Sequence, residues 1–462
     1  MAEPWAILGI DLHVEPTGPG LRRGLTDALR EAVRSGRLAP GTRLPSSRTL
    51  AADLGIARNT VADAYADLVA EGWLTARQGS GTRVAAREVV PPSGTAPRPR
   101  APVRPAYDLR PGSPDLASFP RTAWLKAARR ALAAAPHHAL DYGDPRGRPE
   151  LRAALAAYLS RARGVRTGPE RIVVCAGFAH GLKLLGTVLR ARGARTVAVE
   201  SYGLDVHRRI LAASGLDTAP LPFDRLGTDP GALSGADALL LTPAHQFPMG
   251  VPLHRDRRTA VVDWARRTGG LVLEDDYDGE FRYDRQPVGA LQGLDPDRVV
   301  YLGTASKSLA PGLRLAWTVL PPGLAEEVAA AKGGVDTCGV LDQLTLAEFL
   351  TSGAYDRHVR ATRLRYRRRR DALIAAVTTR APQARVTGIA AGLHVLLRLP
   401  PGTEQSVVQV ANWRDLALHG LARYTHPAAR AEPVDALVVG YGTPPDHAWS
   451  GALDALSAVL PG

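Results

Sequence analysis

Hydrophobic positions near the N-terminus recur with a helical period. In "GLRRGLTDALREAVRSG" a leucine or valine stands at positions 21, 25, 29 and 33, on one face of a helix that Gly36 ends. "LPSSRTLAADLG", with its serine cap signal, and "IARNTVADAYADLVAEGW" continue this pattern. "WLTARQGSGTRVA" indicates two short strands around a Gly-Ser-Gly turn. The pattern predicts a winged helix-turn-helix over residues 15–85.

A proline-rich segment follows this unit. "EVVPPSGTAPRPRAPVRPA" contains almost no large apolar side chain. Such a stretch buries too little surface to offset the entropy of ordering it. We therefore expect an extended linker over residues 86–107.

Beyond the linker, short and continuous apolar runs alternate with helical patterns. Continuous apolar runs are typical of strands that are buried on both faces, as in a parallel sheet covered by helices. Residues 108–462 are therefore predicted to form an α/β unit with a mostly parallel sheet. "GLHVLLRLP" and "DALVVGYG" predict a smaller C-terminal α/β portion. The runs predicted as main-sheet strands are "RIVVCAG", "RTVAVES", "ADALLLTP", "GGLVLEDD", "RVVYLGT" and "RLAWTVLP".

Charge adds a candidate partner without locating its site. A net charge of +13 favours a polyanionic partner, but the excess is spread along the chain. The densest basic run, "RHVRATRLRYRRRRD", begins at Arg357 and predicts a helix. Its arginines form either a solvated face or a second patch that contacts phosphates.

Cysteine content and hydropathy favour a cytoplasmic protein. Cys175 and Cys338 are too few for a disulfide framework or a metal cluster, and suit a reducing compartment as buried thiols. The apolar runs are far shorter than the roughly 20 residues of a membrane helix. The N-terminal residues do not resemble an export signal. The twelve histidines contain no HExxH or similar spacing, so no metal site is predicted.

The helix that begins at "ARNTV" is the candidate DNA reader. In a helix-turn-helix, the first turn of the second helix meets the base edges. A three-helix protein-interaction module would fit the same pattern. However, "LPSSRTLAADLGIARNTVADAYADLVAEGWL" closely resembles the DNA-binding domain of GntR-type bacterial transcription regulators. The resemblance implies DNA contacts by Arg48, Arg58, Asn59 and Thr60, and by Gln78 and Gly79 on the wing.

A lysine stands in "YLGTASKSLAPGLRLAW", although the chain uses arginine almost everywhere else. Of 58 basic residues only four are lysines. A lysine amine can form a Schiff base with an aldehyde, whereas a guanidinium stays charged. Pyridoxal 5'-phosphate is the aldehyde cofactor that uses such a lysine. Lys307 is therefore the candidate for holding it.

The other groups that this cofactor needs also follow predicted strands. "LVLEDDYDGEF" offers Asp275 for the ring nitrogen and Tyr277 for the ring oxygen. A dinucleotide site is not favoured, because no GxGxxG follows a strand. The candidate phosphate donors are Thr304, Ser306 and Arg314 beside the lysine, and Phe178 and Ala179 where "VCAGFAHGLKLL" turns from strand into helix.

Four motifs in order resemble the fold type I aminotransferases. They are "YGDPRGRPELRAALAAYL", "TPAHQFPMG", "EDDYDGEFRY" and "GTASKSLAPGLRLAW". The resemblance implies that Lys307 forms the Schiff base and Arg314 binds the phosphate, and it favours Asp275 over Asp276. It also implies that Tyr142 reaches the partner subunit's phosphate, that His245 lies beside the cofactor ring, and that "SYGL", with Tyr202, replaces the family's "DPGY".

The fusion of these two units resembles the MocR subfamily of GntR-type regulators. That implies a head-to-tail homodimer in which pyridoxal phosphate, or its amino-acid adduct, changes the hold on promoter DNA.

One departure bears on activity. Val438 and Val439 stand where aminotransferases often place an arginine for the substrate carboxylate, and Arg423 is the nearest substitute. This favours a sensor, as in regulators of vitamin B6 synthesis, with at most residual transaminase activity. A working aminotransferase with an attached DNA-binding module is the alternative, and a domain that merely dimerises is a third.

Overall fold

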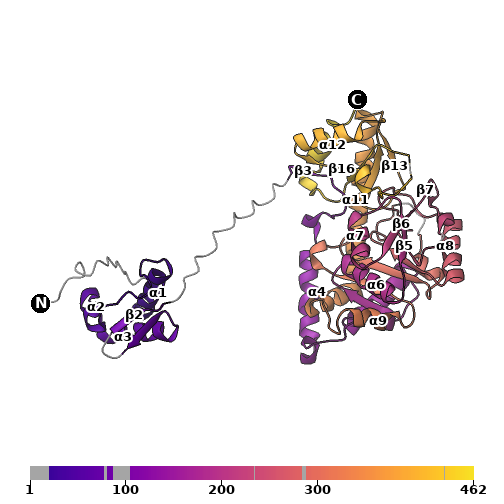
Figure 1. The fold of residues 1–462 in the computed structure, drawn as a ribbon. Helices are drawn as coiled ribbons and strands as arrows, with labels where there is room; N and C mark the ends of the chain where they lie inside the picture. Colours follow the sequence, from indigo (N-terminus) through magenta and orange to yellow (C-terminus); the bar gives the residue numbers. More distant parts are fainter. Residues whose placement is uncertain are drawn as a thin grey trace. The chain divides into compact units, whose positions relative to one another are not determined.

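The computed structural model describes residues 20–77, 81–86, 105–233, 235–283, 288–430 and 432–461. They fall into two compact units, one within Met1–Val103 and one within Arg104–Gly462. Figure 1 shows the smaller unit in indigo and the larger unit in purple to yellow.

The smaller unit contains the predicted three helices and hairpin. Ser46 caps the second helix, since its hydroxyl accepts a hydrogen bond from the Thr49 amide. Leu25, Val61 and Leu68 are fully buried in one core that the helices and hairpin share. The elements are α1 (Leu21–Arg34), α2 (Ser47–Leu54), α3 (Arg58–Ala70), β1 (Leu74–Arg77) and β2 (Gly81–Val84), with β1 antiparallel to β2.

The larger unit alternates helices and strands around a main sheet (Figure 1). Its helices are α4 (Arg121–Ala134), α5 (Pro149–Arg163), α6 (Phe178–Ala191), α7 (Asp205–Ala213), α8 (Arg255–Thr268), α9 (Leu324–Ala331), α10 (Val340–Thr351), α11 (Ala354–Arg380), α12 (Glu404–Trp413) and α13 (Trp449–Ser457). Its main-sheet strands are β4 (Ile172–Cys175), β5 (Thr196–Glu200), β6 (Asp217–Leu221), β9 (Ala238–Leu241), β10 (Leu271–Asp275), β11 (Val299–Thr304) and β12 (Ala316–Val319).

The main sheet is mostly parallel and buried, which confirms the prediction. Within the described residues its order is β4-β12-β11-β10-β9-β5-β6, and only β12 runs antiparallel to its neighbours. Separate apolar clusters cover its two faces. Parallel neighbours end at the same edge, so the carboxyl ends of β5, β9, β10 and β11 lie together there.

The hydrophobic pattern did not predict β6. This strand lies at the edge of the sheet, and its side chains are alternately exposed and partly buried. It also contains Pro220, which an edge strand tolerates because one side of its backbone has no partner. A strand of this kind lacks the continuous apolar run that marks the others.

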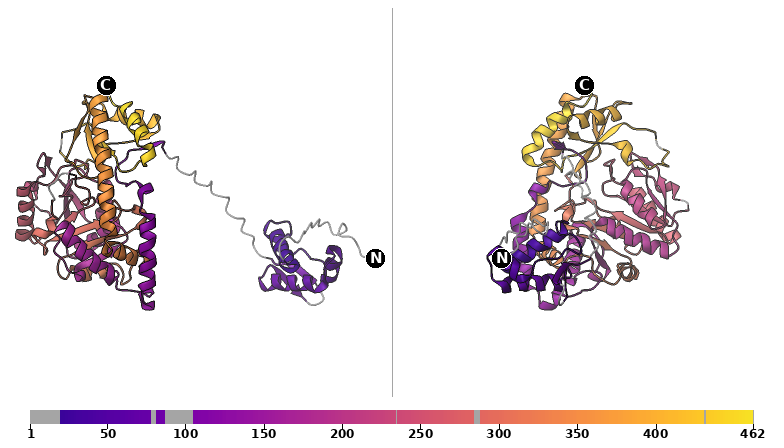
Figure 2. Two further views of the ribbon diagram at one scale, coloured as in Figure 1. Left: turned by 180° about the vertical axis from the view of Figure 1, so that it is seen from behind. Right: turned by 60° about the vertical axis from the view of Figure 1, so that its left-hand side comes forward.

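The predicted C-terminal α/β portion is present. It contains an antiparallel sheet in the order β13-β14-β17-β16. Figure 2 shows α11, in orange, running along the larger unit toward this sheet. None of the described helices is long and apolar enough to cross a membrane. The remaining strands are β3 (Tyr107–Asp108), β7 (Phe223–Asp224), β8 (Gly227–Thr228), β13 (Arg385–Thr387), β14 (His394–Arg398), β15 (Leu416–Ala417), β16 (His419–Gly420) and β17 (Ala436–Gly440).

Candidate functional site

A cavity of about 300 Å³ lies at the carboxyl edge of the main sheet. Open α/β sheets bind ligands at this edge. The lining includes the candidate lysine, Lys307, which follows β11. The other predicted residues on the lining are Asp275, Tyr277, Thr304, Ser306, Arg314, Phe178, Ala179 and Tyr202.

Lys307 presents its amine to this cavity. The Nζ atom donates a hydrogen bond to the carbonyl of Gly112. Removal from bulk water lowers the pKa of Lys307, and the carboxyl groups of Asp275 and Asp278 oppose that shift. A lysine with a lowered pKa is more often neutral, which is the form that attacks a carbonyl.

Asp275, the last residue of β10, offers an unused acceptor. Its Oδ1 atom is buried and has no hydrogen-bond partner among the described residues. Burial raises the pKa of Asp275 well above its usual range, and Lys307 opposes that shift. Buried polar atoms are normally paired. The N–H of a protonated pyridine ring would satisfy this oxygen, so the site fits pyridoxal phosphate.

The start of α6 forms a cradle for an anion. Gly177 precedes the helix with a φ of 89°, in the region that favours glycine. A Cβ atom there would overlap the guanidinium of Arg314, which donates to the Ala176 carbonyl at 2.6 Å. The first-turn amides of α6, including those of Phe178 and Ala179, point beyond the helix end.

The turn after β11 adds hydroxyl groups to this cradle. Thr304 Oγ1 donates to Ser306 Oγ at 2.9 Å and accepts from the Ser306 amide at 3.1 Å. Both residues line the cavity with Arg314. Hydroxyls, helix amides and an arginine together fit a phosphate group.

His245 does not lie where the resemblance implied. It is absent from the cavity lining, whereas Phe247 and Tyr277 belong to it. The Tyr277 hydroxyl donates to the His245 carbonyl and lies 3.1 Å from its Nδ1 atom. Phe247, two residues later in "HQFPMG", lines the cavity in place of His245.

His245 belongs to a buried group that includes Asp278 and His394. Their ligand atoms lie within 4.8 Å of one another, which a metal site would need. However, His245 Nδ1 is 2.8 Å from Asp278 Oδ2, and His394 Nε2 is 3.2 Å from the Pro248 carbonyl. We interpret the group as hydrogen-bonded support for Tyr277.

Two further predicted residues lie away from the cavity. Tyr142 is 96 % exposed. Its predicted contact with the phosphate of a partner subunit needs a second subunit. Arg423 is exposed on a short helical turn, Leu421–Tyr424, and is absent from the lining. Its predicted contact with an effector therefore has no geometric support in the single chain.

The position of the missing arginine is filled by an apolar cluster. Val438 is fully buried and packs in one cluster with Tyr202, Phe247 and Tyr424. Val439 is also fully buried, in a neighbouring core. Neither valine can bind a carboxylate.

The lining also includes polar residues that were not predicted: Glu200, His207, Arg208, Thr242 and His394. Burial raises the pKa of Glu200 to about 7, against hydrogen bonds from Thr242, Thr228 and Gln246. Burial lowers the pKa of His207 to about 3. Their positions could have pointed to the site: Glu200 ends the buried strand β5, and His207 and Arg208 lie in the first turn of the next helix.

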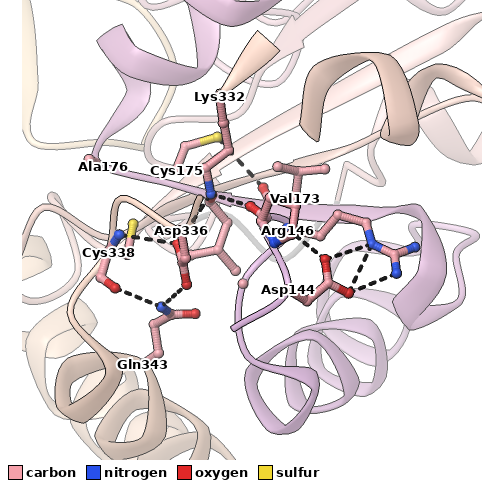
Figure 3. A network of polar contacts seen from close by, with 12 residues as sticks. Asp144, Arg146, Val173, Cys175, Ala176, Lys332, Asp336, Cys338 and Gln343 are labelled. Atoms are coloured by element: carbon pink, nitrogen blue, oxygen red, sulfur yellow. Dashed lines mark hydrogen bonds and ion pairs between the residues drawn. The ribbon is translucent and has the colours of Figure 1, made fainter. Parts of the chain in front are cut away.

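A second lysine, Lys332, holds β4, the strand that leads into the phosphate cradle. Figure 3 shows its amine among Val173, Cys175, Asp336 and the loop that carries Asp144. Lys332 Nζ donates to the Val174 carbonyl at 3.0 Å, to the Pro145 carbonyl, and to Asp336 Oδ1 at 3.2 Å. These bonds hold β4 against the loop before α5.

The two cysteines are free and buried beside this network. Burial raises the pKa of Cys175 to about 12 and that of Cys338 to about 11. A thiol that keeps its proton is a poor nucleophile. The structure therefore agrees with the prediction of inert buried thiols.

The candidate DNA contacts lie on an exposed face of the smaller unit. Arg48, Arg58 and Asn59 are exposed and Thr60 is partly exposed. Gln78 and Gly79 lie outside the described residues.

Ion pairs with α1 neutralise Asp67 and Glu71 at the C-terminal end of α3. Arg22 contacts Asp67 at 2.9 Å, and Arg30 contacts Glu71 at 2.7 and 2.9 Å. Both arginines belong to α1, so the acids they neutralise no longer offset the positive charge of Arg58 in the first turn of α3.

Comparisons with known proteins agree with this geometry. The family model for aminotransferase class I and II matches residues 108–426, and that for bacterial regulatory proteins of the gntR family matches 21–84. The chain is 36 % identical to the HTH-type pyridoxine biosynthesis transcriptional regulator PdxR of Corynebacterium glutamicum, over 89 % of each chain. It is 32 % identical to the probable rhizopine catabolism regulatory protein MocR of Rhizobium meliloti, over 95 % of this chain and 94 % of that protein.

A solved structure supports the same fold. An archaeal alanine:glyoxylate aminotransferase matches with a TM-score of 0.69 and 25 % identity, over 77 % of this chain and 90 % of that one. The aminotransferase class I and II model lies within the larger unit, and the gntR model lies within the smaller unit. The chain therefore belongs to the MocR subfamily of GntR-type transcription regulators, in which a helix-turn-helix is joined to a fold type I aminotransferase-like domain.

Proposed function

We propose that this protein is a transcription regulator whose hold on promoter DNA is set by pyridoxal phosphate, free or as an amino-acid adduct, at Lys307. The observation that carries the proposal is the pair formed by Lys307 and the unpartnered Asp275 Oδ1 in one cavity. A lysine with a lowered pKa and a buried oxygen without a hydrogen-bond partner both destabilise the folded protein unless a ligand interacts with them.

Each side chain of the site has a defined task in this proposal. When bound, pyridoxal phosphate supplies an aldehyde carbon that an amine can attack and a ring that withdraws electrons. Lys307 presents its amine, and Asp275 would accept a hydrogen bond from the protonated ring nitrogen. Tyr277 lines the cavity, and its hydroxyl would have to leave the His245 carbonyl in order to donate to the ring oxygen. The α6 amides with Thr304, Ser306 and Arg314 bind the phosphate.

We further propose that the regulator acts in the cytoplasm as a head-to-tail homodimer. The exposed Tyr142 supports this, as do Leu125 and Leu132, which leave apolar surface on α4. Two winged helices would then read two half-sites, and the segment 86–107 would connect each reader to its sensor. Ligand occupancy changes DNA affinity by the same factor that DNA changes ligand affinity.

Genes of vitamin B6 or amino-acid metabolism are the proposed targets. The identity to a regulator named for pyridoxine biosynthesis supports the first class. A sensor of the cofactor alone would need no clamp for a substrate carboxylate, whereas a sensor of an amino-acid adduct would need one. Val438 is buried, so any such clamp would be formed elsewhere.

The test is a titration of wild type and Lys307→Ala with pyridoxal phosphate, followed by visible absorbance and by binding to promoter DNA. We expect a visible band and a cofactor-dependent DNA affinity in the wild type alone. Lys183→Ala is the matched control, because Lys183 is exposed on α6 and should behave as wild type. A wild type without the band, or with DNA binding indifferent to the cofactor, would refute the proposal.

A working aminotransferase is the second candidate. It is favoured by the lysine, aspartate and phosphate cradle, which an enzyme of this fold would share. Sustained amino-group transfer from an amino acid to a keto acid, lost in Lys307→Ala, would establish it. We expect less than one turnover per site.

A further inference from the structure

The cavity contains a second arginine besides Arg314. Arg208 lies in the first turn of α7 and belongs to the cavity lining. We propose that Arg208 binds the carboxylate of an amino-acid effector. This inference rests on the proposed function and names the class of ligand that the site takes.

The Arg208 side chain is largely removed from solvent, and its ion pair with Asp205 is long. Its side chain is only 12 % exposed. Among the described residues, it donates to the Gly203 carbonyl at a long 3.3 Å and lies 3.5 Å from Asp205 Oδ1. A guanidinium has five N–H donors, so most of them remain available.

The nearby acid belongs to another arginine. Asp205 Oδ2 lies 2.8 Å from Nε of Arg209, which is 73 % exposed. Burial lowers the pKa of Arg208, and Asp205 opposes this shift only in part. A charge held in this way is costly until an anion pairs with it. A carboxylate with two parallel oxygens would match the fork of Arg208.

The other arginine on the lining, Arg314, is already part of the phosphate cradle. Arg314 donates to Ala176 and packs against Gly177, so it belongs to the phosphate cradle. Val438 fills the place of the expected arginine, and Arg423 is absent from the lining. Arg208 is thus the remaining arginine of the cavity within the described part of the chain.

The surroundings restrict the ligand to a monocarboxylic amino acid with an uncharged side chain. One free guanidinium can pair with one carboxylate. Much of the cavity lining is apolar, including Leu204, Phe247 and Leu393. A second carboxylate on the ligand would therefore be buried against apolar groups, which is unfavourable.

The experiment compares L-alanine with L-alaninamide, which keeps the amine and lacks the carboxylate. Full-length protein loaded with pyridoxal phosphate is titrated with each, and the change in cofactor absorbance gives the affinity. We expect wild type to prefer alanine by roughly 10- to 100-fold, as a charge-assisted pair would provide. Arg208→Gln should lose that preference.

Arg209→Gln is the matched control. It removes the neighbouring guanidinium on the same helix, which is exposed and faces Asp205. We expect this variant to retain the preference for alanine. Arg208→Lys keeps the charge without the fork, and should retain only part of it.

Labelling of the wild type provides a readout that does not require a variant to fold. Phenylglyoxal modification is followed by mass spectrometry, and alanine should protect Arg208 where alaninamide does not. Equal protection by both compounds would overturn the inference.

Other outcomes distinguish the inference from the proposed function. If wild type forms the cofactor band but does not prefer alanine, or if Arg208→Gln keeps the preference, Arg208 is not the clamp and the sensor survives. If Arg208→Gln loses cofactor retention while the preference is unchanged, Arg208 binds phosphate and the inference is wrong. If wild type forms no band, both proposals fail.

Discussion

Lys307 and Lys332 are both removed from bulk water, yet their surroundings are opposite. The side chain of Lys332 is fully inaccessible, and its amine donates to two carbonyls and to Asp336. Lys307 faces a cavity and donates to one carbonyl. An amine whose N–H groups all donate hydrogen bonds to the protein stabilises the fold. An amine with few protein partners that faces a cavity can react with a ligand there. Burial alone does not separate these two roles.

The largest expected difference is in covalent labelling. When the wild type is treated with pyridoxal phosphate and borohydride, Lys307 should be modified completely and Lys332 not at all. The reason is that the cavity admits an aldehyde to Lys307, while Lys332 is sealed among its partners. Peptide mass spectrometry reads the positions. Modification of Lys332 at a comparable rate would remove the distinction.

The second difference is in stability. Lys332→Met should lower the free energy of unfolding by about 3 to 5 kcal/mol, because it leaves Asp336 buried without its cation. Urea denaturation followed by circular dichroism measures it. The control, Lys183→Met, changes an exposed lysine and should stay within about 0.5 kcal/mol of wild type. An equal effect of both variants would contradict the assigned role of Lys332.

The cradle between the two lysines provides a third test. Gly177→Ala adds a Cβ that overlaps the Arg314 guanidinium at a positive φ. We expect it to cost about 1 to 3 kcal/mol of stability and to reduce retention of pyridoxal phosphate more than that of pyridoxal. Gly193→Ala has the same kind of backbone strain, at φ 96°, with open space around the added atom. It should lose stability without losing the preference for the phosphate.

The smallest effect concerns pH. Because the pKa of Lys307 is lowered from 10.5, the folded protein without cofactor opposes protonation of this amine. Folding stability therefore rises with pH through the window between the folded pKa and 10.5. Lys307→Met should be more stable than wild type at neutral pH, and the gap should close as pH approaches 10.5. Thermal unfolding across that range checks it, and a gap that widens would contradict it.

Most of the fold could be predicted from the sequence because the patterns that mark its elements are local. Continuous apolar runs marked β10 and β11, and acids or a lysine directly after those runs marked Asp275 and Lys307. Those residues share one sheet edge because parallel neighbours end together. The strand β6 was missed because an edge strand needs no continuous apolar run.

The remaining site residues depend on packing between distant segments. His245 was predicted beside the ring, but only the folded arrangement reveals that Tyr277 lies in front of it. Arg208 is one of many arginines in the chain, and no local pattern distinguishes it from the exposed Arg209. Its burial arises where α7 meets the cavity, which is a tertiary property.

The pairing of β4 with β12 has a consequence for synthesis. Cys175 lies opposite Ala316 in the sheet, so the larger unit cannot complete its core until most of the chain has left the ribosome. The last strand of the smaller unit ends at Val84, and its core uses only residues up to that strand. We expect it to fold while translation continues. We therefore expect each new molecule to be able to bind DNA before its aminotransferase-like unit has folded.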